Sequence, residues 1–143
     1  MDAPAITQFV GEYDFLSNGY NHKITFNGLN FLNAEAAFYA QKVKDDRAKI
    51  KFTRLSGNKA RAKAAQAQSI PDWEFQKDNI MIAVLRTKFS DSELKQKLLD
   101  TYPSKLINTT TFRDTYWGFS DGKGKNKLGE LLELVRQELK EKE

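Results

Sequence analysis

The chain has 143 residues, 40% of them hydrophobic and 29% charged, with a formal net charge of +4. This is the composition of a globular domain that is long enough to bury a core. With no cysteine and one histidine, disulfides, thiol catalysis, zinc sites of Cys and His and multi-histidine triads are excluded. No EF-hand or Walker spacing appears, although an all-oxygen Mg²⁺ or Ca²⁺ site stays open. In an enzyme, proton transfer would therefore fall to Asp, Glu, Lys or Tyr.

No apolar run approaches the ~20 residues that a membrane-spanning helix needs. The start of the chain, Met1-Asp2-Ala3-Pro4, lacks the basic and apolar regions of a signal peptide. We therefore expect a cytoplasmic protein. No repeat, linker or low-complexity segment divides residues 1–143, which predicts a single α+β domain, mainly helical, with an N-terminal β-hairpin.

The predicted elements begin with an ordered loop that ends at Ser17-Asn18. Asn27-Gly28 between two apolar runs is the strongest short-range signal of a hairpin. A helix then starts at Asn33, a good N-cap, and extends to about Ile50. A chain break is expected at Gly57-Asn58, followed by helices over 59–68 and 73–89. A further helix runs from the capping box at 90–93 to Pro103, and a strand covers 106–107 and 109–111. The chain then forms a loop over 115–127 and an amphipathic helix from Leu128.

The first turns of the helix from Asn33 carry the most suggestive pattern. Helical spacing puts Glu35, Phe38, Tyr39 and Lys42 on one face, and alanines occupy the opposite side. A carboxylate, two rings and an ammonium on one face suit the wall of a ligand site. The simpler interpretation is that Glu35 interacts with the helix dipole, the rings are core and Lys42 is solvated.

Two further polar clusters lie beside apolar segments, at Ser17-Asn18 and over Asp114–Asn126. In the second, Asp114 stands three residues before Trp117, and a loop with Gly122, Gly124 and three lysines leads into the last helix. Glycines before a helix allow backbone N–H groups to approach an anion, although most such loops are only turns. Trp73 and Trp117 are either base-stacking groups or core residues.

Positive charge is concentrated between Lys42 and Lys63, a segment that contains nine lysines and arginines but only two aspartates. Such a segment favours an anionic partner, including nucleic acid, or is a solvated helix surface.

Together these segments resemble the NADAR (YbiA-like) family over nearly the whole chain, from Phe9 to about Arg136. The resemblance rests on several ordered motifs: Gly11-x-Tyr13-x-Phe15-Leu16-Ser17-Asn18, Glu35-Ala36-Ala37-Phe38-Tyr39-Ala40-Gln41-Lys42, Ala62-Lys63, Asp72-Trp73, Met81, Lys88-Phe89, Asp114-x-x-Trp117-Gly118 and Gly124-Lys125-Asn126-Lys127-Leu128-Gly129.

The resemblance implies an N-glycosidase that needs no cofactor or metal. Family members hydrolyse the bond between a ribose and a nitrogenous group, in riboflavin-pathway aminopyrimidine ribotides or in ADP-ribosylated guanine of nucleic acid. It implies Glu35 and Asp114 as the catalytic carboxylates. It implies substrate contacts for a further set: Ser17, Asn18, Lys42, Trp73, Trp117, Gly118 and Asn126.

The chain departs from the family pattern at several positions. Gln66-Ala67 replaces a Gly-Arg pair, Asn108 stands where glutamate is common and Gly19 where an aromatic is common. These three affect the expected substrate contacts, whereas Glu133 in place of a methionine does not. Both carboxylates are present, which favours an enzyme over a non-catalytic module that binds ADP-ribose or NAD, or over a nucleic-acid-binding protein.

Overall fold

The computed structural model describes residues 3–109 and 114–143. The chain forms two compact units: a central unit over Asn18–Lys88, and a terminal unit made of Met1–Ser17 with Phe89–Glu143. No helix among the described residues is long and apolar enough to cross a membrane. The single-domain organisation stays a prediction.

The central unit begins with the expected hairpin. Strands β1 (Ile24–Phe26) and β2 (Leu29–Phe31) are antiparallel, with Ile24 opposite Phe31. Asn27 and Gly28 have φ of 48° and 83°, the left-handed values that a tight two-residue turn requires. Ile24 and Phe31 are buried, so the alternation of the sequence correctly indicates the inner face of the hairpin.

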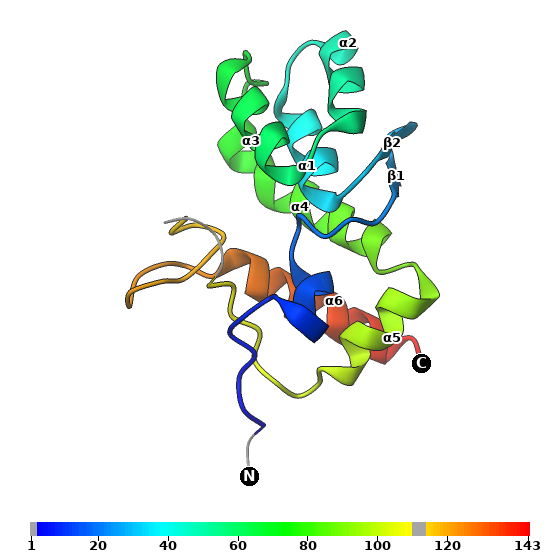
Figure 1. Ribbon diagram of the computed structural model, residues 1–143, viewed down its shortest axis with the longest axis vertical. Helices are drawn as coiled ribbons and strands as arrows, with labels where there is room; N and C mark the ends of the chain where they lie inside the picture. The colour runs from blue at the N-terminus through cyan, green and yellow to red at the C-terminus, as the bar shows by residue number, and fades with distance from the viewer. Residues whose placement is uncertain (1–2, 110–113) are drawn as a thin grey trace. The chain divides into compact units, whose positions relative to one another are not determined.

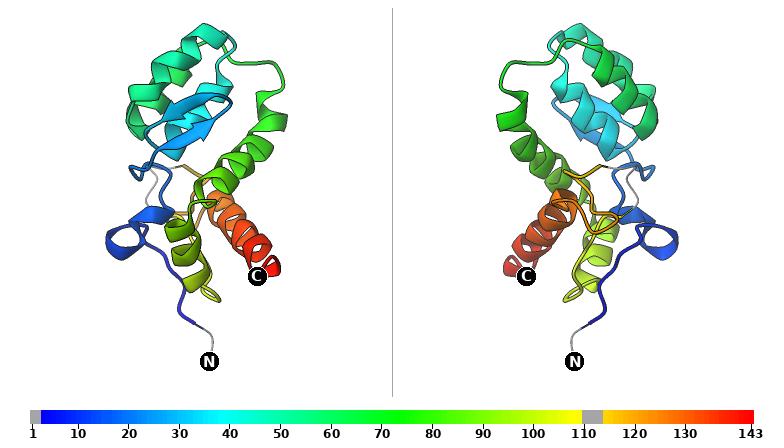
Figure 2. Two further views of the ribbon diagram at one scale, coloured as in Figure 1. Left: turned by 90° about the vertical axis from the view of Figure 1, so that its right-hand side faces the viewer. Right: turned by 90° about the vertical axis from the view of Figure 1, so that its left-hand side faces the viewer.

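Helix α1 (Ala34–Lys42) lies against α3 (Gly57–Gln66), α4 (Trp73–Lys88) and the hairpin (Figures 1 and 2). Asn33 caps it, because its side-chain oxygen accepts a hydrogen bond from the Ala36 N–H at 2.8 Å. The alanines at 36, 37 and 40 are fully buried. Small side chains on this side allow neighbouring helices to approach closely, as the sequence predicts.

The prediction that this helix continues to Ile50 is wrong. Helix α1 ends at Lys42, and the short helices α2 (Asp46–Lys49) and η2 (Ile50–Arg54) follow. The Ile70 N–H donates to the Lys42 carbonyl and the Lys44 N–H to the Gln68 carbonyl, both at 2.9 Å. These backbone groups are engaged with a segment far along the chain, so they are not available to continue the helix.

The predicted break at Gly57-Asn58 is also wrong. Ser56 caps α3 by accepting a hydrogen bond from the Lys59 N–H at 3.3 Å, and Gly57 is the first helical residue. Ser56 is a good N-cap residue, a signal that the glycine concealed. Helix α4, in contrast, matches its prediction to within a residue at its end.

The terminal unit contains η1 (Gly11–Leu16), α5 (Ser92–Asp100) and α6 (Lys127–Glu141), with α5 packed on α6. Asp91, rather than Ser90, caps α5 through the Leu94 N–H at 3.0 Å. The amphipathic pattern of α6 is confirmed by its buried residues Leu128, Leu131, Leu132 and Val135.

The expected strand near residue 106 does not form over the described residues. Leu106 makes an isolated parallel bridge with Ile6. In that bridge the Ile6 N–H donates to Lys105 and the Ile107 N–H donates to Ile6, at 2.8 and 2.9 Å. Thr110 and Thr111 lie outside the described residues. The predicted class, a mainly helical α+β fold with an N-terminal hairpin, is confirmed.

Candidate active site

Glu35 is held at the start of α1 by its backbone. Its N–H donates to the Asn18 carbonyl at 2.9 Å, and the cap residue Asn33 fixes the first turn. The Glu35 side chain is half-buried. Its carboxylate therefore belongs to the first turn of a capped helix, where the helix dipole favours negative charge.

Asn18, beside Glu35, is buried with 6% of its surface exposed. Its Nδ2 donates to the Met81 Sδ at 3.5 Å, a weak contact. Its Oδ1 is buried and has no hydrogen-bond partner among the described residues. An unsatisfied buried acceptor costs about 1–3 kcal/mol. This uncommon feature is consistent with a group that faces a ligand.

Lys42 and Trp73 meet at the other end of α1. The Lys42 Nζ lies 5.9 Å from the centroid of the Trp73 ring, a cation–π arrangement. Phe38 lies 5.1 Å from Trp73, ring to ring. Phe38 is itself only 1% exposed and is a core residue, whereas Tyr39, Lys42 and Trp73 are half-buried. Of the two rings predicted to line a ligand site, Phe38 is therefore part of the core.

Asp114 organises the turn that carries Trp117. Its Oδ1 accepts hydrogen bonds from the Tyr116 and Trp117 N–H groups at 2.9 and 2.8 Å, and its carbonyl accepts from the Gly118 N–H at 3.2 Å. The spacing of Asp-x-x-Trp therefore has a local structural cause, an Asx turn. Trp117 is buried and packs edge-on against Tyr116 at 4.8 Å.

Asn126 anchors the loop before α6. Its Nδ2 donates to the Leu106 carbonyl at 2.9 Å, and its Oδ1 accepts from the Asn108 N–H at 2.8 Å. Both ends of the amide thus contact backbone, and the substrate contact of Asn126 stays a prediction. Its φ of 51° is left-handed, a conformation that asparagine tolerates better than most residues.

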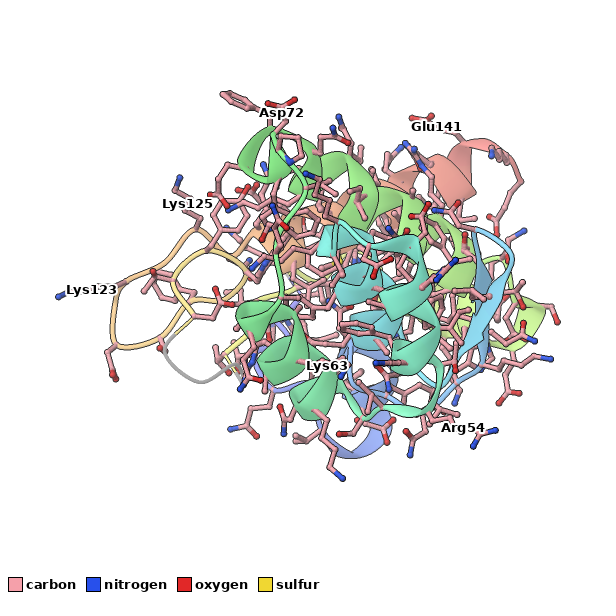
Figure 3. The ribbon with its side chains drawn as sticks, turned by 90° about the horizontal axis from the view of Figure 1, so that it is seen from above. Arg54, Lys63, Asp72, Lys123, Lys125 and Glu141 are labelled. Atoms are coloured by element: carbon pink, nitrogen blue, oxygen red, sulfur yellow. The ribbon has the colours of Figure 1, made fainter. Side chains whose placement is uncertain are left out.

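Gly124 of this loop has no room for a side chain. A Cβ at Gly124 would clash with the Gly118 carbonyl oxygen and come within 2.8 Å of the Phe119 Cα. Lys123 and Lys125 extend from the same loop (Figure 3). Beside it lies a pocket of about 250 Å³, whose lining includes Lys105, Lys125, Phe119 and Glu130. Anion binding by the loop stays a prediction.

The nine expected site residues fall into the two units. Asn18, Glu35, Lys42 and Trp73 belong to the central unit, and Ser17, Asp114, Trp117, Gly118 and Asn126 to the terminal unit. Within the units, direct contacts join Asn18 to Glu35, Lys42 to Trp73, and Asp114 to Trp117 and Gly118. The Ser17 N–H donates to Asp14 at 3.0 Å. The assigned roles stay predictions.

The basic segment of the central unit is largely uncompensated. Lys49 pairs with Asp46 at 2.9 Å. Among the described residues, no ion pair is found for Lys44, Arg47, Lys51, Arg54, Lys59, Arg61 or Lys63. Arg54 ends η2 and Lys63 lies on α3 (Figure 3). We call this set of seven cations the basic surface.

The expected site residues leave out two residues of the central unit, Lys88, which was quoted only as part of a family motif, and Gly57. Lys88, on α4, is only 1% exposed, and its Nζ lies 5.7 Å from the Tyr20 ring centroid. Its helical spacing from Met81, Val84 and Leu85 places it on the buried face, a signal available in the sequence. Gly57 is the other: its Cα faces the side chain of Glu35, which no local pattern indicates.

Comparison with known proteins gives consistent results. The protein-family model of the NADAR domain matches residues 2–140 of the chain. The N-glycosidase YbiA of Escherichia coli (strain K12) is 36% identical over 133 residues, covering 90% of this chain and 82% of that protein. A riboflavin biosynthesis protein of Vibrio vulnificus (strain YJ016) is 33% identical over 140 residues, covering 90% of this chain and 36% of that longer protein.

The fold agrees as well. The NMR structure of the E. coli protein YbiA matches with a TM-score of 0.88 at 32% identity, covering 99% of this chain and 88% of that chain. A family model that covers almost every residue, relatives above 30% identity and a shared fold lead to one conclusion. The chain belongs to the NADAR family.

Proposed function

We propose that the protein is an N-glycosidase that hydrolyses the C–N bond between a phosphoribose or ADP-ribose and a nitrogenous base. The observation that carries the proposal is the half-buried Glu35, whose N–H bonds to Asn18, next to a buried amide oxygen that has no partner among the described residues. Relatives at 36% identity named N-glycosidase YbiA support the same class of reaction.

The proposed reaction is a hydrolysis. The C–N bond breaks as the sugar becomes oxocarbenium-like, water adds to the anomeric carbon, and the proton lost by water balances the proton gained by the leaving nitrogen. Glu35 activates the water or stabilises the positive sugar. Asp114 holds ribose hydroxyl groups or acts as a second acid–base group. These steps use carboxylates alone, so no cofactor is invoked.

The remaining contacts follow from the two ends of α1. Glu35 and Lys42 are seven residues apart on the helix, a separation of about 10 Å along its axis. Glu35 therefore serves the anomeric carbon, while Lys42 serves a phosphate. Trp73, next to Lys42, stacks on the base or on the adenine of an ADP-ribose. The Asn18 Oδ1 accepts a hydrogen bond from a hydroxyl or amine of the substrate.

The test of catalysis is Glu35→Gln, which keeps the shape of the side chain and removes its charge. We expect kcat to fall by at least ~100-fold, because general acid–base catalysis typically contributes ~10²–10⁴. Glu12→Gln, at an exposed position, is the control for loss of one negative charge. Retention of activity by Glu35→Gln within about tenfold contradicts the proposed role.

Two substrate classes are to be compared directly. The wild-type protein is incubated with an aminopyrimidine ribotide and, separately, with DNA containing ADP-ribosylated guanine, and the products are identified by mass spectrometry. The riboflavin biosynthesis relative favours the first substrate, and the basic surface favours the second. Release of no product from either substrate, together with binding of ADP-ribose by calorimetry, would replace the proposal with a non-catalytic binding module.

A further inference from the structure

We infer that Gly57 is a positioning residue for Glu35, an inference that rests on the proposed function of that carboxylate. Gly57 begins α3 and is buried. A side chain at this position would point at the stem of the Glu35 side chain, whose Cβ and Cγ are among the three nearest atoms. The absence of a side chain at residue 57 therefore leaves room for the stem of Glu35.

The contact geometry supports this role. A Cβ at Gly57 would lie 3.1 Å from the Glu35 Cβ, 3.3 Å from the Glu35 Cγ and 3.3 Å from the Gly19 Cα. These separations are shorter than ordinary van der Waals contacts. The φ of Gly57 is not left-handed. The position thus requires glycine for space next to Glu35, and an alanine there is compatible with the backbone conformation.

The backbone of Glu35 is held by hydrogen bonds. Its N–H is bonded to the Asn18 carbonyl at 2.9 Å, and Asn33 caps the turn that contains it. Rotation of the Glu35 side chain can relieve the contact with its Cγ, but its Cβ moves only with the backbone, so the added methyl group would displace the start of the Glu35 side chain by a few tenths of an ångström. Because catalytic groups must be aligned closely, a misplacement of about 1 Å can reduce a rate ~100-fold.

One buried amide ties the two helix starts together. The Asn33 Oδ1 accepts from the Ala36 N–H in α1 at 2.8 Å, while its Nδ2 donates to the Leu55 carbonyl at 3.1 Å. Leu55 lies two residues before Gly57, and Asn33 is fully buried. The separation of Glu35 and Gly57 is thus set by direct bonds, as positioning requires.

The decisive variant is Gly57→Ala. We expect kcat to fall about tenfold while KM changes less than about threefold, because the substrate contacts remain and only the alignment changes. The melting temperature should fall, because the Glu35 Cβ and the Gly19 Cα that crowd the added methyl group move only with the backbone. A merely structural glycine would lose stability in the same way but leave the kcat of the folded enzyme unchanged.

The matched control is Asn58→Ala, the next residue of α3, which is exposed. It also places alanine at the start of α3, but at an exposed position, and its kcat should stay within about twofold of the wild type.

A double variant tests whether Gly57 acts through Glu35. In the Glu35→Gln background, adding Gly57→Ala should change the residual rate less than about twofold, because residues that act as a unit are non-additive. An equal loss in both backgrounds overturns the inference. Should Gly57→Ala fail to fold, Asn33→Ser decides: it keeps a capping oxygen but removes the bond to Leu55, and unchanged kcat overturns the inference.

The results separate the two proposals. A fully active Gly57→Ala enzyme together with an inactive Glu35→Gln enzyme overturns the role of Gly57 alone. An active Glu35→Gln enzyme overturns the proposed role of Glu35, and the positioning role falls with it.

Discussion

Two buried asparagines of the central unit differ in how their amides are used. Both polar ends of Asn33 contact backbone, in α1 and at Leu55. Among the described residues, the side-chain nitrogen of Asn18 makes only the weak contact with Met81, and its side-chain oxygen has no partner. A buried amide without a protein hydrogen-bond partner is a better candidate for a substrate contact than an amide whose hydrogen bonds all go to the backbone.

This difference predicts that alanine at residue 18 mainly weakens substrate binding, whereas alanine at residue 33 mainly lowers stability. Asn18→Ala should raise KM about tenfold, the effect of removing one hydrogen bond, and should lower the free energy of unfolding by less than ~1 kcal/mol. Asn33→Ala, the control, should lower it by about 2 kcal/mol, because a helix cap and the partner of a buried carbonyl are both removed. Thermal denaturation and steady-state kinetics check both. An unchanged KM for Asn18→Ala would remove Asn18 from the substrate site.

In the terminal unit, helix α6 leaves no room for a side chain at Gly129. A Cβ at Gly129 would overlap the Leu106 carbonyl oxygen and lie 2.5 Å from both amide atoms of Asn126. The neighbours are backbone and a buried, doubly bonded amide, so neither can move cheaply. Gly129 therefore allows α6 to lie against the segment that contains Leu106.

We predict that Gly129→Ala destabilises the protein by about 3 kcal/mol, the upper end of the usual cost of overpacking. Thermal or denaturant unfolding measures the change. Leu134→Ala, on the exposed side of the same helix, is the control and should change stability by no more than about 0.5 kcal/mol. Wild-type stability in the Gly129→Ala protein would show that α6 can shift without cost.

The buried side chain of Arg136 makes a second connection between segments of the terminal unit. The Arg136 Nη1 donates to the Thr101 Oγ1 at 2.9 Å and to the Ser104 carbonyl at 2.8 Å. Burial lowers the pKa of Arg136, an effect that Glu133 partly opposes. Arg136 thereby connects α6 to the segment after α5. This contact agrees with the packing of these two helices.

For the molecule as a whole, the net charge of +4 is unevenly distributed. The basic surface lies entirely in the central unit. If the substrate is a nucleic-acid adduct, these cations should contact phosphates, and binding should weaken steeply with salt. Binding of a small ribotide has no such requirement.

We therefore predict that replacing Arg54 and Lys63 with glutamine raises KM for a DNA adduct and leaves KM for a ribotide unchanged. In duplex DNA, the slope of log K against log salt should decrease by about 0.9 for each phosphate that the variant no longer neutralises. Replacing Lys97 and Lys142 with glutamine, both exposed in the terminal unit, removes the same charge elsewhere. Equal effects of the two variants would indicate net charge rather than a binding surface.

Local signals in the sequence were sufficient for several elements. Asn27-Gly28 determined the hairpin, Asn33 the start of α1, and the apolar spacing α4 and α6. Each depends on residues within a few positions of one another, namely a turn dipeptide, a capping side chain or a helical stripe. The family also followed from the sequence, because its motifs are ordered along the chain.

Only the tertiary structure decided where those elements end and what their side chains contact. Helix α1 ends at Lys42 because the backbone groups of Lys42 and Lys44 form hydrogen bonds with residues 70 and 68. Phe38, predicted to line a ligand site, is a core residue. Gly57 begins a helix and faces Glu35, although its residue type indicated a break. All three depend on contacts between residues distant in the chain, which local propensity and periodicity cannot encode.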